Sequence, residues 1–126
     1  MKHPPTATDL KVFVPCMHYE NSLAYYTALG CEVKWKSDDL SEMELGGQRF
    51  YLQNYYNRDW ANNFMIYVDV DSAREWFDHI TQVLADHSFK YARVKPPKVE
   101  PHAIVTYAWD PSGVLLHFAE DHPADE

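Results

Sequence analysis

The chain is poor in glycine, cysteine and basic residues. It has 4 glycines and 2 cysteines in 126 residues, and 11 Lys and Arg against 19 Asp and Glu, which gives a formal net charge of −8. So few glycines argue against the glycine-rich loops that cradle phosphates. No Cys-x-x-Cys or Gly-x-Ser-x-Gly motif is present. The acidic balance argues against nucleic acid and anionic membrane surfaces as partners, because both select for clustered Lys and Arg.

Long apolar runs and targeting patterns are also missing. No segment is long enough to span a bilayer, and the first residues lack the charged and apolar regions of a secretory signal. Cys16 lies at the end of a predicted strand and Cys31 directly after a predicted helix. Both are expected to be small buried packing residues. We therefore expect a reduced, cytoplasmic protein.

What the chain does contain predicts one globular domain over residues 1–126. Its hydrophobic content is 46% and its aromatic content 15%, enough to build a core at this length. The pattern predicts an α+β fold in two modules, at about 10–54 and 62–120. An aromatic, polar loop at 55–61 joins them, and an acidic tail at 121–126 follows.

The two modules are predicted to repeat the same order of elements. In the first, the pattern predicts strand 10–14, helix 21–29 stopped by Gly30, strand 31–36, and a hairpin of strands 40–45 and 48–54. In the second, it predicts strand 62–70, a helix begun by the capping box Ser72-x-x-Glu75, strand 89–94, and a hairpin of strands 102–109 and 114–119. The order βαβββ occurs twice, which indicates an internal duplication of about sixty residues.

Several motifs carry a resemblance to a known family. They are Leu23-Ala24-Tyr25-Tyr26 with Leu29-Gly30, Glu44-Leu45-Gly46-Gly47, Val68-Asp69-Val70-Asp71, Pro96-Pro97 and Asp110-Pro111-Ser112-Gly113. In this order they resemble the glyoxalase / bleomycin-resistance / extradiol-dioxygenase superfamily, also called vicinal oxygen chelate proteins. The resemblance implies two βαβββ modules that form curled mixed sheets around a cavity, with helices on the outer face. It also implies a homodimer, because the family often builds the cavity across a subunit interface.

The resemblance further implies where a metal would be bound. Metal-dependent members carry ligands on the first strand, on the strand that opens the second half and on the last strand. These positions fall here near Lys11, near Asn63 and at His117. A protonated Lys has no lone pair to donate and Asn is a weak ligand, so one imidazole remains, which is too few. The sequence therefore predicts no metal, no cofactor and no catalytic residue.

We accordingly expect a metal-free small-molecule binding protein, closest to the bleomycin-resistance type, that sequesters an aromatic or drug-like ligand. Antibiotic resistance is the role that the resemblance implies. One alternative is a metal-dependent lyase, isomerase or dioxygenase of the same superfamily, with ligands such as Glu120 or His102 in a different strand register. Another is an interaction protein whose cavity is closed by its own side chains.

Period-two alternation, applied to the family geometry, assigns one face of each strand to the cavity. The predicted ligand-binding residues are Arg49, Tyr51, Gln53, Trp60, Met65, Tyr67, Tyr107, Trp109 and His117. Such a wall suits a flat aromatic ligand, neutral or cationic, that stacks on Tyr and Trp rings. Arg49 has a second interpretation, as the ion-pair partner of Glu42 or Glu44 across the hairpin.

Other members of this set have alternatives that the sequence leaves open. Tyr107 and Trp109 also fit a dimer interface, where aromatic side chains are enriched. His117 also fits a hydrogen-bonded strand histidine, because one imidazole without a partner makes neither a metal site nor a catalytic triad.

Overall fold

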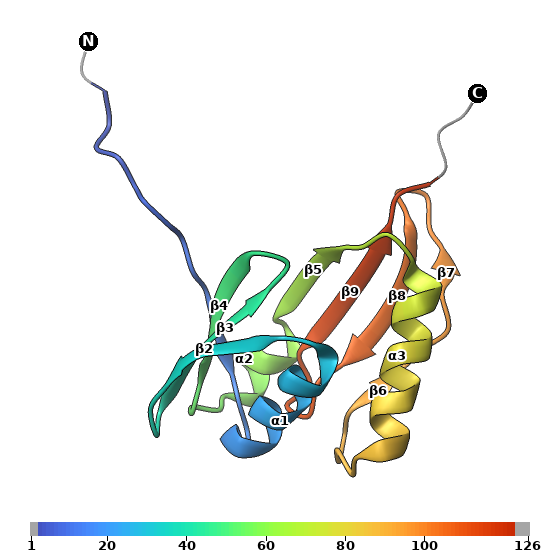
Figure 1. The fold of residues 1–126 in the computed structure, drawn as a ribbon, viewed down its shortest axis with the longest axis horizontal. Coiled ribbons are helices and arrows are strands. Elements are labelled where there is room, and N and C mark those ends of the chain that lie inside the picture. Colours follow the sequence, from blue (N-terminus) through green and yellow to red (C-terminus); the bar gives the residue numbers. More distant parts are fainter. Residues whose placement is uncertain (1–2, 123–126) are drawn as a thin grey trace.

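The computed structural model describes residues 3–122 and contains two mixed sheets and three helices (Figure 1). Positions 1–2 of the N-terminal leader and positions 123–126 of the predicted tail lie outside the described residues. Within the described part of the chain, no helix is both long enough and apolar enough to cross a membrane.

Each module forms one sheet in which the first strand pairs in parallel with the last. The first sheet, sheet A, consists of β1 (Phe13–Pro15), β2 (Glu32–Lys36), β3 (Leu40–Leu45) and β4 (Gln48–Gln53), in the order β1-β4-β3-β2. The second, sheet B, consists of β5 (Met65–Asp69), β6 (Arg93–Val94), β7 (Lys98–Val99), β8 (Ile104–Trp109) and β9 (Leu115–Glu120). Its order is β5-β9-β8-β6, and β7 also pairs with β8. The predicted α+β fold is confirmed.

The helices are α1 (Tyr19–Leu29), α2 (Arg58–Asn62) and α3 (Ala73–Asp86). Helix α1 ends where Gly30 adopts φ 120°, as predicted. The cap of α3 is also as predicted, because the Ser72 hydroxyl accepts a hydrogen bond from the Glu75 amide at 3.1 Å. The β3–β4 hairpin turns at Gly46 and Gly47, both at positive φ (59° and 81°), which is the geometry of a two-residue hairpin turn.

Several predicted boundaries are wrong. The first strand was expected over 10–14 but is Phe13–Pro15, so proline lies within it. The loop at 55–61 and the start of strand 62–70 contain α2, because the Asn57 side chain accepts from the Trp60 amide and caps a short helix. Strand 89–94 shrinks to β6, and β7 was not predicted at all.

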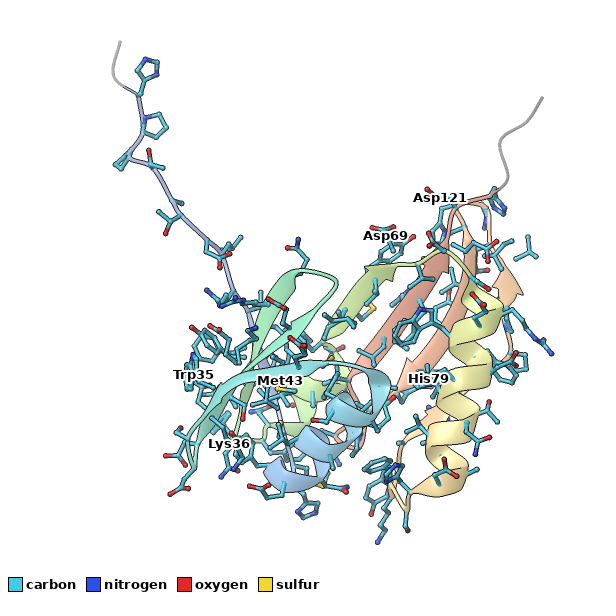
Figure 2. The ribbon with its side chains drawn as sticks, viewed as in Figure 1. Trp35, Lys36, Met43, Asp69, His79 and Asp121 are labelled. Carbon is cyan, nitrogen blue, oxygen red and sulfur yellow. The ribbon has the colours of Figure 1, made fainter. Side chains whose placement is uncertain are left out.

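Besides a small separate cluster of Ala103, Val105 and Ala119 that packs against Tyr107, the main core lies between the helices and a single face of each sheet. From α1 it takes Tyr25, Tyr26 and Leu29, and these pack with side chains of both sheets, among them Met43, Leu52, Leu116 and Phe118. Figure 2 labels Met43 between sheet A and α1, and His79 on the side of α3 toward α1. The His79 ring lies with Nε2 3.1 Å from the Leu29 carbonyl oxygen, which ties the two helices together. The opposite face of each sheet is therefore left outside this core.

The two cysteines lie in this core, as predicted. Cys16 is 1% exposed and Cys31 5% exposed, and both are free thiols. Burial raises the pKa of each thiol to about 12, so the reactive thiolate form is scarce at neutral pH.

The turn at Asp110-Pro111-Ser112-Gly113, in the second module, is hydrogen-bonded to the first module. The buried carboxylate of Asp110 accepts hydrogen bonds from the Ser112 and Val114 amides at 2.8 and 2.9 Å, which closes the turn. It also accepts from the Tyr26 hydroxyl of α1 at 2.8 Å. The Ser112 hydroxyl accepts from the Met17 amide at 2.8 Å, so the turn of the second module also fixes the start of α1.

We expect the Asp110 carboxyl to make folding stability pH-dependent. Burial raises its pKa from the ordinary 3.8 to about 6, although the hydrogen bonds that it accepts oppose this shift. The contribution of the protonated carboxyl to folding stability is fully present below about pH 4. It is lost as the pH rises through 6, because the folded state then holds an ionised group out of water. Between pH 4.5 and pH 7, the free energy of unfolding measured with urea should therefore fall less in Asp110→Asn than in the wild type.

A matched control separates the charge from the hydrogen bonds. Asp110→Ala removes the acceptor of two turn amides, so it should destabilise the protein at every pH, by roughly 1–3 kcal/mol per amide left without a partner. An Asp110→Asn protein with the same pH profile as the wild type would contradict the assignment of the shift to this carboxyl.

Candidate functional site

All predicted site residues except Trp60, which lies on α2, are on the face of each sheet opposite to the core and the helices. We call these the outer faces of the sheets. On β4, Phe50 and Leu52 pack in the core, and the alternate positions 49, 51 and 53 point to the other side. On β9, Leu116 and Phe118 are buried in the core, and positions 115 and 117 alternate with them. The alternation predicted from the sequence is therefore confirmed for these strands.

The outer face of sheet A combines a short aromatic row with ion pairs. The Tyr51 ring lies between Phe13 and Trp35, with ring centroids 5.1 and 5.8 Å away. Figure 2 shows Trp35 at the part of β2 far from sheet B. The Lys11 Nζ lies 5.9 Å from the centroid of the Tyr51 ring. Gln53 continues this face at the end of β4, opposite Leu40.

Arg49 is held on this face by two carboxylates. Its Nη1 lies 2.9 Å from Glu42 Oε1, and its Nε lies 3.0 Å from Glu44 Oε2. Glu42 is 6% exposed and also lies 4.0 Å from the Lys11 Nζ. The ion-pair interpretation of Arg49 is therefore confirmed, with its Nε and Nη1 both directed at carboxylates.

The outer face of sheet B carries the largest group of predicted site residues. We call Met65, Tyr67, Tyr107, Trp109 and His117 the aromatic face. Register places Tyr67 and Tyr107 on either side of His117, on β5 and β8. Their ring centroids lie 5.7 and 5.0 Å from that of His117. Met65 is 62% exposed and Tyr67 50% exposed, a large apolar exposure for two neighbouring positions of one strand.

His117 occupies the centre of the aromatic face. Its Nδ1 is buried and has no hydrogen-bond partner within residues 3–122, so that atom does not support the interpretation of a hydrogen-bonded strand histidine. Burial lowers the pKa of His117, and the nearby His102 lowers it further. The imidazole is thus favoured in its neutral form, as an acceptor or donor beside two phenol rings.

One phenol of this face, that of Tyr107, is hydrogen-bonded to a neighbouring carboxylate. The Tyr107 hydroxyl donates to Glu100 Oε2 at 2.6 Å, a contact that raises the Tyr107 pKa to about 12 and lowers that of Glu100. His102, expected above as an alternative metal ligand, lies in the β7–β8 connection with its ring centroid 6.3 Å from that of Tyr67. Glu100, in the same connection, was not predicted as a neighbour of the site, because tertiary pairing sets the path of this segment.

The structure does not bring all the predicted residues into one hollow. One hollow, of about 550 Å³ and lined by Asn62, Tyr91, Arg93, Trp109 and Gly113, includes Trp109 alone of the predicted set. Another, of about 380 Å³, lies between the β3–β4 hairpin and β5 and includes Tyr67 alone of that set. Trp60 lies on α2, where its ring is 6.3 Å from Phe64 and 6.1 Å from Tyr55 by ring centroids.

The residues at the positions implied for a metal do not fit such a site. Lys11 is engaged with Asp9 at 2.8 Å. Asn63 is not on a strand, because it ends α2 and donates its amide to the Asp59 carbonyl. His117 is flanked by phenols, which leaves one imidazole as a donor. Across the described part of the chain, no three His, Cys, Asp or Glu side chains are placed to hold a metal ion.

The position of His102 generates a testable expectation for His117. Because burial is the larger cause of the lowered pKa, His102→Gln should raise the pKa of His117 only partway toward its ordinary value. An NMR titration of the imidazole Cε1 protons measures both values. A pKa of His117 at or above 6.5 in the unaltered protein would contradict the buried environment described here.

Comparisons with known proteins find likeness in structure alone. No protein-family model matches the chain, and no curated protein matches it in sequence. An antibiotic-binding protein, TnmS3 from Streptomyces sp. CB03234, superimposes with a TM-score of 0.76 at 12% identity, over 95% of this chain and 100% of the other. A bleomycin resistance determinant encoded on the transposon Tn5 gives 0.75 at 16% identity, over 93% and 100%.

Enzymes share the same architecture. Lactoylglutathione lyase from Agrobacterium tumefaciens superimposes with a TM-score of 0.67 at 16% identity, over 93% of this chain and 95% of the other. Two modules that share the order βαβββ, the second with the additional short strand β7, pack on a common core. With likeness to both groups along more than nine-tenths of the chain, they confirm the resemblance at the level of structure. The chain therefore has the fold of the bleomycin-resistance and glyoxalase proteins, the vicinal oxygen chelate fold.

Proposed function

We propose that this protein binds a small aromatic molecule on the aromatic face of sheet B, without the help of a metal ion. The observation that carries the proposal is the row of Tyr67, His117 and Tyr107 across three adjacent strands, with Trp109 and Met65 beside it. The rings offer broad apolar surfaces, and a single neutral imidazole supplies a polar group that orients the ligand. The antibiotic-binding protein among the similar structures is consistent with this proposal.

The chemistry of the donor set supports binding without a metal. Lys11, which precedes β1, holds an ammonium group at the position implied for the first ligand. Glu42, 4.0 Å from the Lys11 Nζ, is engaged with Arg49, as is Glu44. A divalent ion would have to displace these pairs to gain oxygen ligands. Sequestration, which needs affinity rather than turnover, is the role we assign to the protein.

We further propose that the binding site is completed in a homodimer. Met65 and Tyr67 are more exposed than large apolar residues commonly are, and the Tyr51 row on sheet A is likewise uncovered on its outer side. A second copy of the chain would cover these surfaces and enclose a ligand between sheets. In that assembly the ligand would rest on the aromatic face of one sheet B, and its sides would be covered by Arg49, Tyr51, Gln53 and Trp60.

Ligand titration tests the proposal. Trp109→Ala should weaken the binding of an aromatic ligand more than His117→Ala, because the indole supplies more stacking area than the imidazole. Isothermal calorimetry over a panel of planar aromatic compounds measures both losses. Larger losses in His117→Ala would indicate that the imidazole acts chemically, and no binding by any compound of the panel would refute the proposal.

Metal content separates this proposal from the metal-dependent alternative. Protein purified without chelator should hold far less than one Zn, Ni, Mn or Fe per chain by elemental analysis, and EDTA should leave ligand affinity unchanged. A stoichiometric ion whose retention depends on His117 would instead indicate a lyase, isomerase or dioxygenase.

A further inference from the structure

Three cations near one end of sheet B have no acidic partner, although the chain is rich in acids. The chain has 19 Asp and Glu against 11 Lys and Arg. Most described cations are paired, as Lys11, Arg49 and Arg74 illustrate. Within residues 3–122, Lys90, Arg93 and Lys95 form no ion pair, and the segment 90–98 contains no Asp or Glu. Local positive charge therefore persists there against the overall charge of the protein.

Two of these cations, Arg93 and Lys95, lie over one tryptophan, and Lys90 lies over Tyr91. Arg93 on β6 pairs in register with Trp109 on β8, and its guanidinium carbon lies 4.1 Å from the centroid of the indole ring. The Lys95 Nζ lies 5.4 Å from the same centroid. A guanidinium stacked on a ring uses its flat face and leaves its N–H groups free at the edge. Arg93 donates no side-chain hydrogen bond to the rest of the described chain.

Arg93 lines a hollow of about 550 Å³ together with Asn62, Tyr91, Trp109 and Gly113. A volume of this size suits a small organic molecule. Tyr91 lies at φ 72°, a conformation that bulky residues rarely adopt and that tends to occur at binding sites. A Cβ atom added at Gly113 would lie 2.9 Å from the Asn62 Oδ1, so glycine at this position lets the Asn62 side chain approach closely.

We propose that this hollow binds a planar organic anion, an aromatic carboxylate, with its carboxylate on the N–H edge of Arg93 and its ring beside Trp109 and Tyr91. Lys95 and Lys90 add positive charge at the rim, and the Asn62 amide supplies a further polar contact. A guanidinium matches a carboxylate through two parallel hydrogen bonds. The inference rests on the proposed function, because Trp109 also belongs to the aromatic face. It assigns an anionic ligand where the sequence analysis expected a neutral or cationic one.

A pair of probes that differ in charge alone tests the inference. Binding of 2-naphthoate and of the neutral 2-naphthamide is measured by calorimetry at low and at physiological salt. Naphthoate should bind about tenfold or more tightly than naphthamide, the size of one charge-assisted contact. This advantage should shrink as salt rises, because the cations are accessible to solvent.

Matched variants locate the effect. Arg93→Gln should remove most of the preference for naphthoate, and Lys95→Gln should reduce it. The control is Arg74→Gln on α3, which also removes an arginine stacked on an aromatic ring, Phe77 at 5.4 Å, and should leave both affinities unchanged. Thermal unfolding of each variant confirms that the fold is intact.

The possible failures point to different conclusions. Equal affinity for the two probes, unaffected by Arg93→Gln, would overturn the anion site and leave the aromatic-ligand proposal standing. A preference for naphthoate that Arg74→Gln removes and Arg93→Gln does not would place the anion elsewhere and overturn the assignment. Binding of neither probe would overturn the anion site and would count against the aromatic face as well.

Discussion

The arrangement of the two modules depends on the hydrogen bonds that the buried carboxyl of Asp110 accepts. It closes the last turn through two backbone amides and reaches α1 of the other module through the Tyr26 hydroxyl. A side chain that satisfies local amides would suffice for a turn; the bond to Tyr26 makes the same group a joint between halves of the chain. Because the site is closed to water, each lost partner there is costly.

That joint holds the two sheets in an arrangement in which one face of each is used for the core and the other is left outside it. With α1 and α3 in contact and one face of each sheet packed against them, the common core takes the apolar residues at alternate strand positions. The remaining positions form the two outer faces. Their compositions differ, since sheet A carries ion pairs around Arg49 and sheet B carries phenol rings around His117. The difference gives one fold two surfaces of unlike chemistry.

The sequence predicted what depends on local pattern. The βαβββ repeat, the stop at Gly30, the cap at Ser72 and the buried cysteines all follow from the spacing of apolar, capping and turn residues. It failed where tertiary pairing decides. The one local signal for the short helix α2 is the cap residue Asn57, and Asn is as common in turns as at caps. The five residues are held as a helix also by packing of Ala61 in the core.

The candidate site shows the same division. Alternation placed the members of the aromatic face on one side of sheet B. It could not show that the outer faces of sheets A and B are separate surfaces in a single chain. The two carboxylates around Arg49 were predictable from cross-strand spacing. The hollow beside Trp109 was not predictable, because its lining comes from three segments that only the fold brings together: Asn62, Tyr91 with Arg93, and Trp109 with Gly113. The signal available in the sequence was the run of cations at 90–98 in an acidic chain.

The depth at which Cys16 and Cys31 lie has a practical consequence for labelling. Their sulfur atoms are shielded from reagents, and the proton is held so firmly that maleimides meet almost no nucleophile at neutral pH. A cysteine installed at an exposed position such as Met65 would consequently react alone. A fluorophore attached there would report on events at the surface of β5 in a protein that keeps both of its natural sulfhydryls.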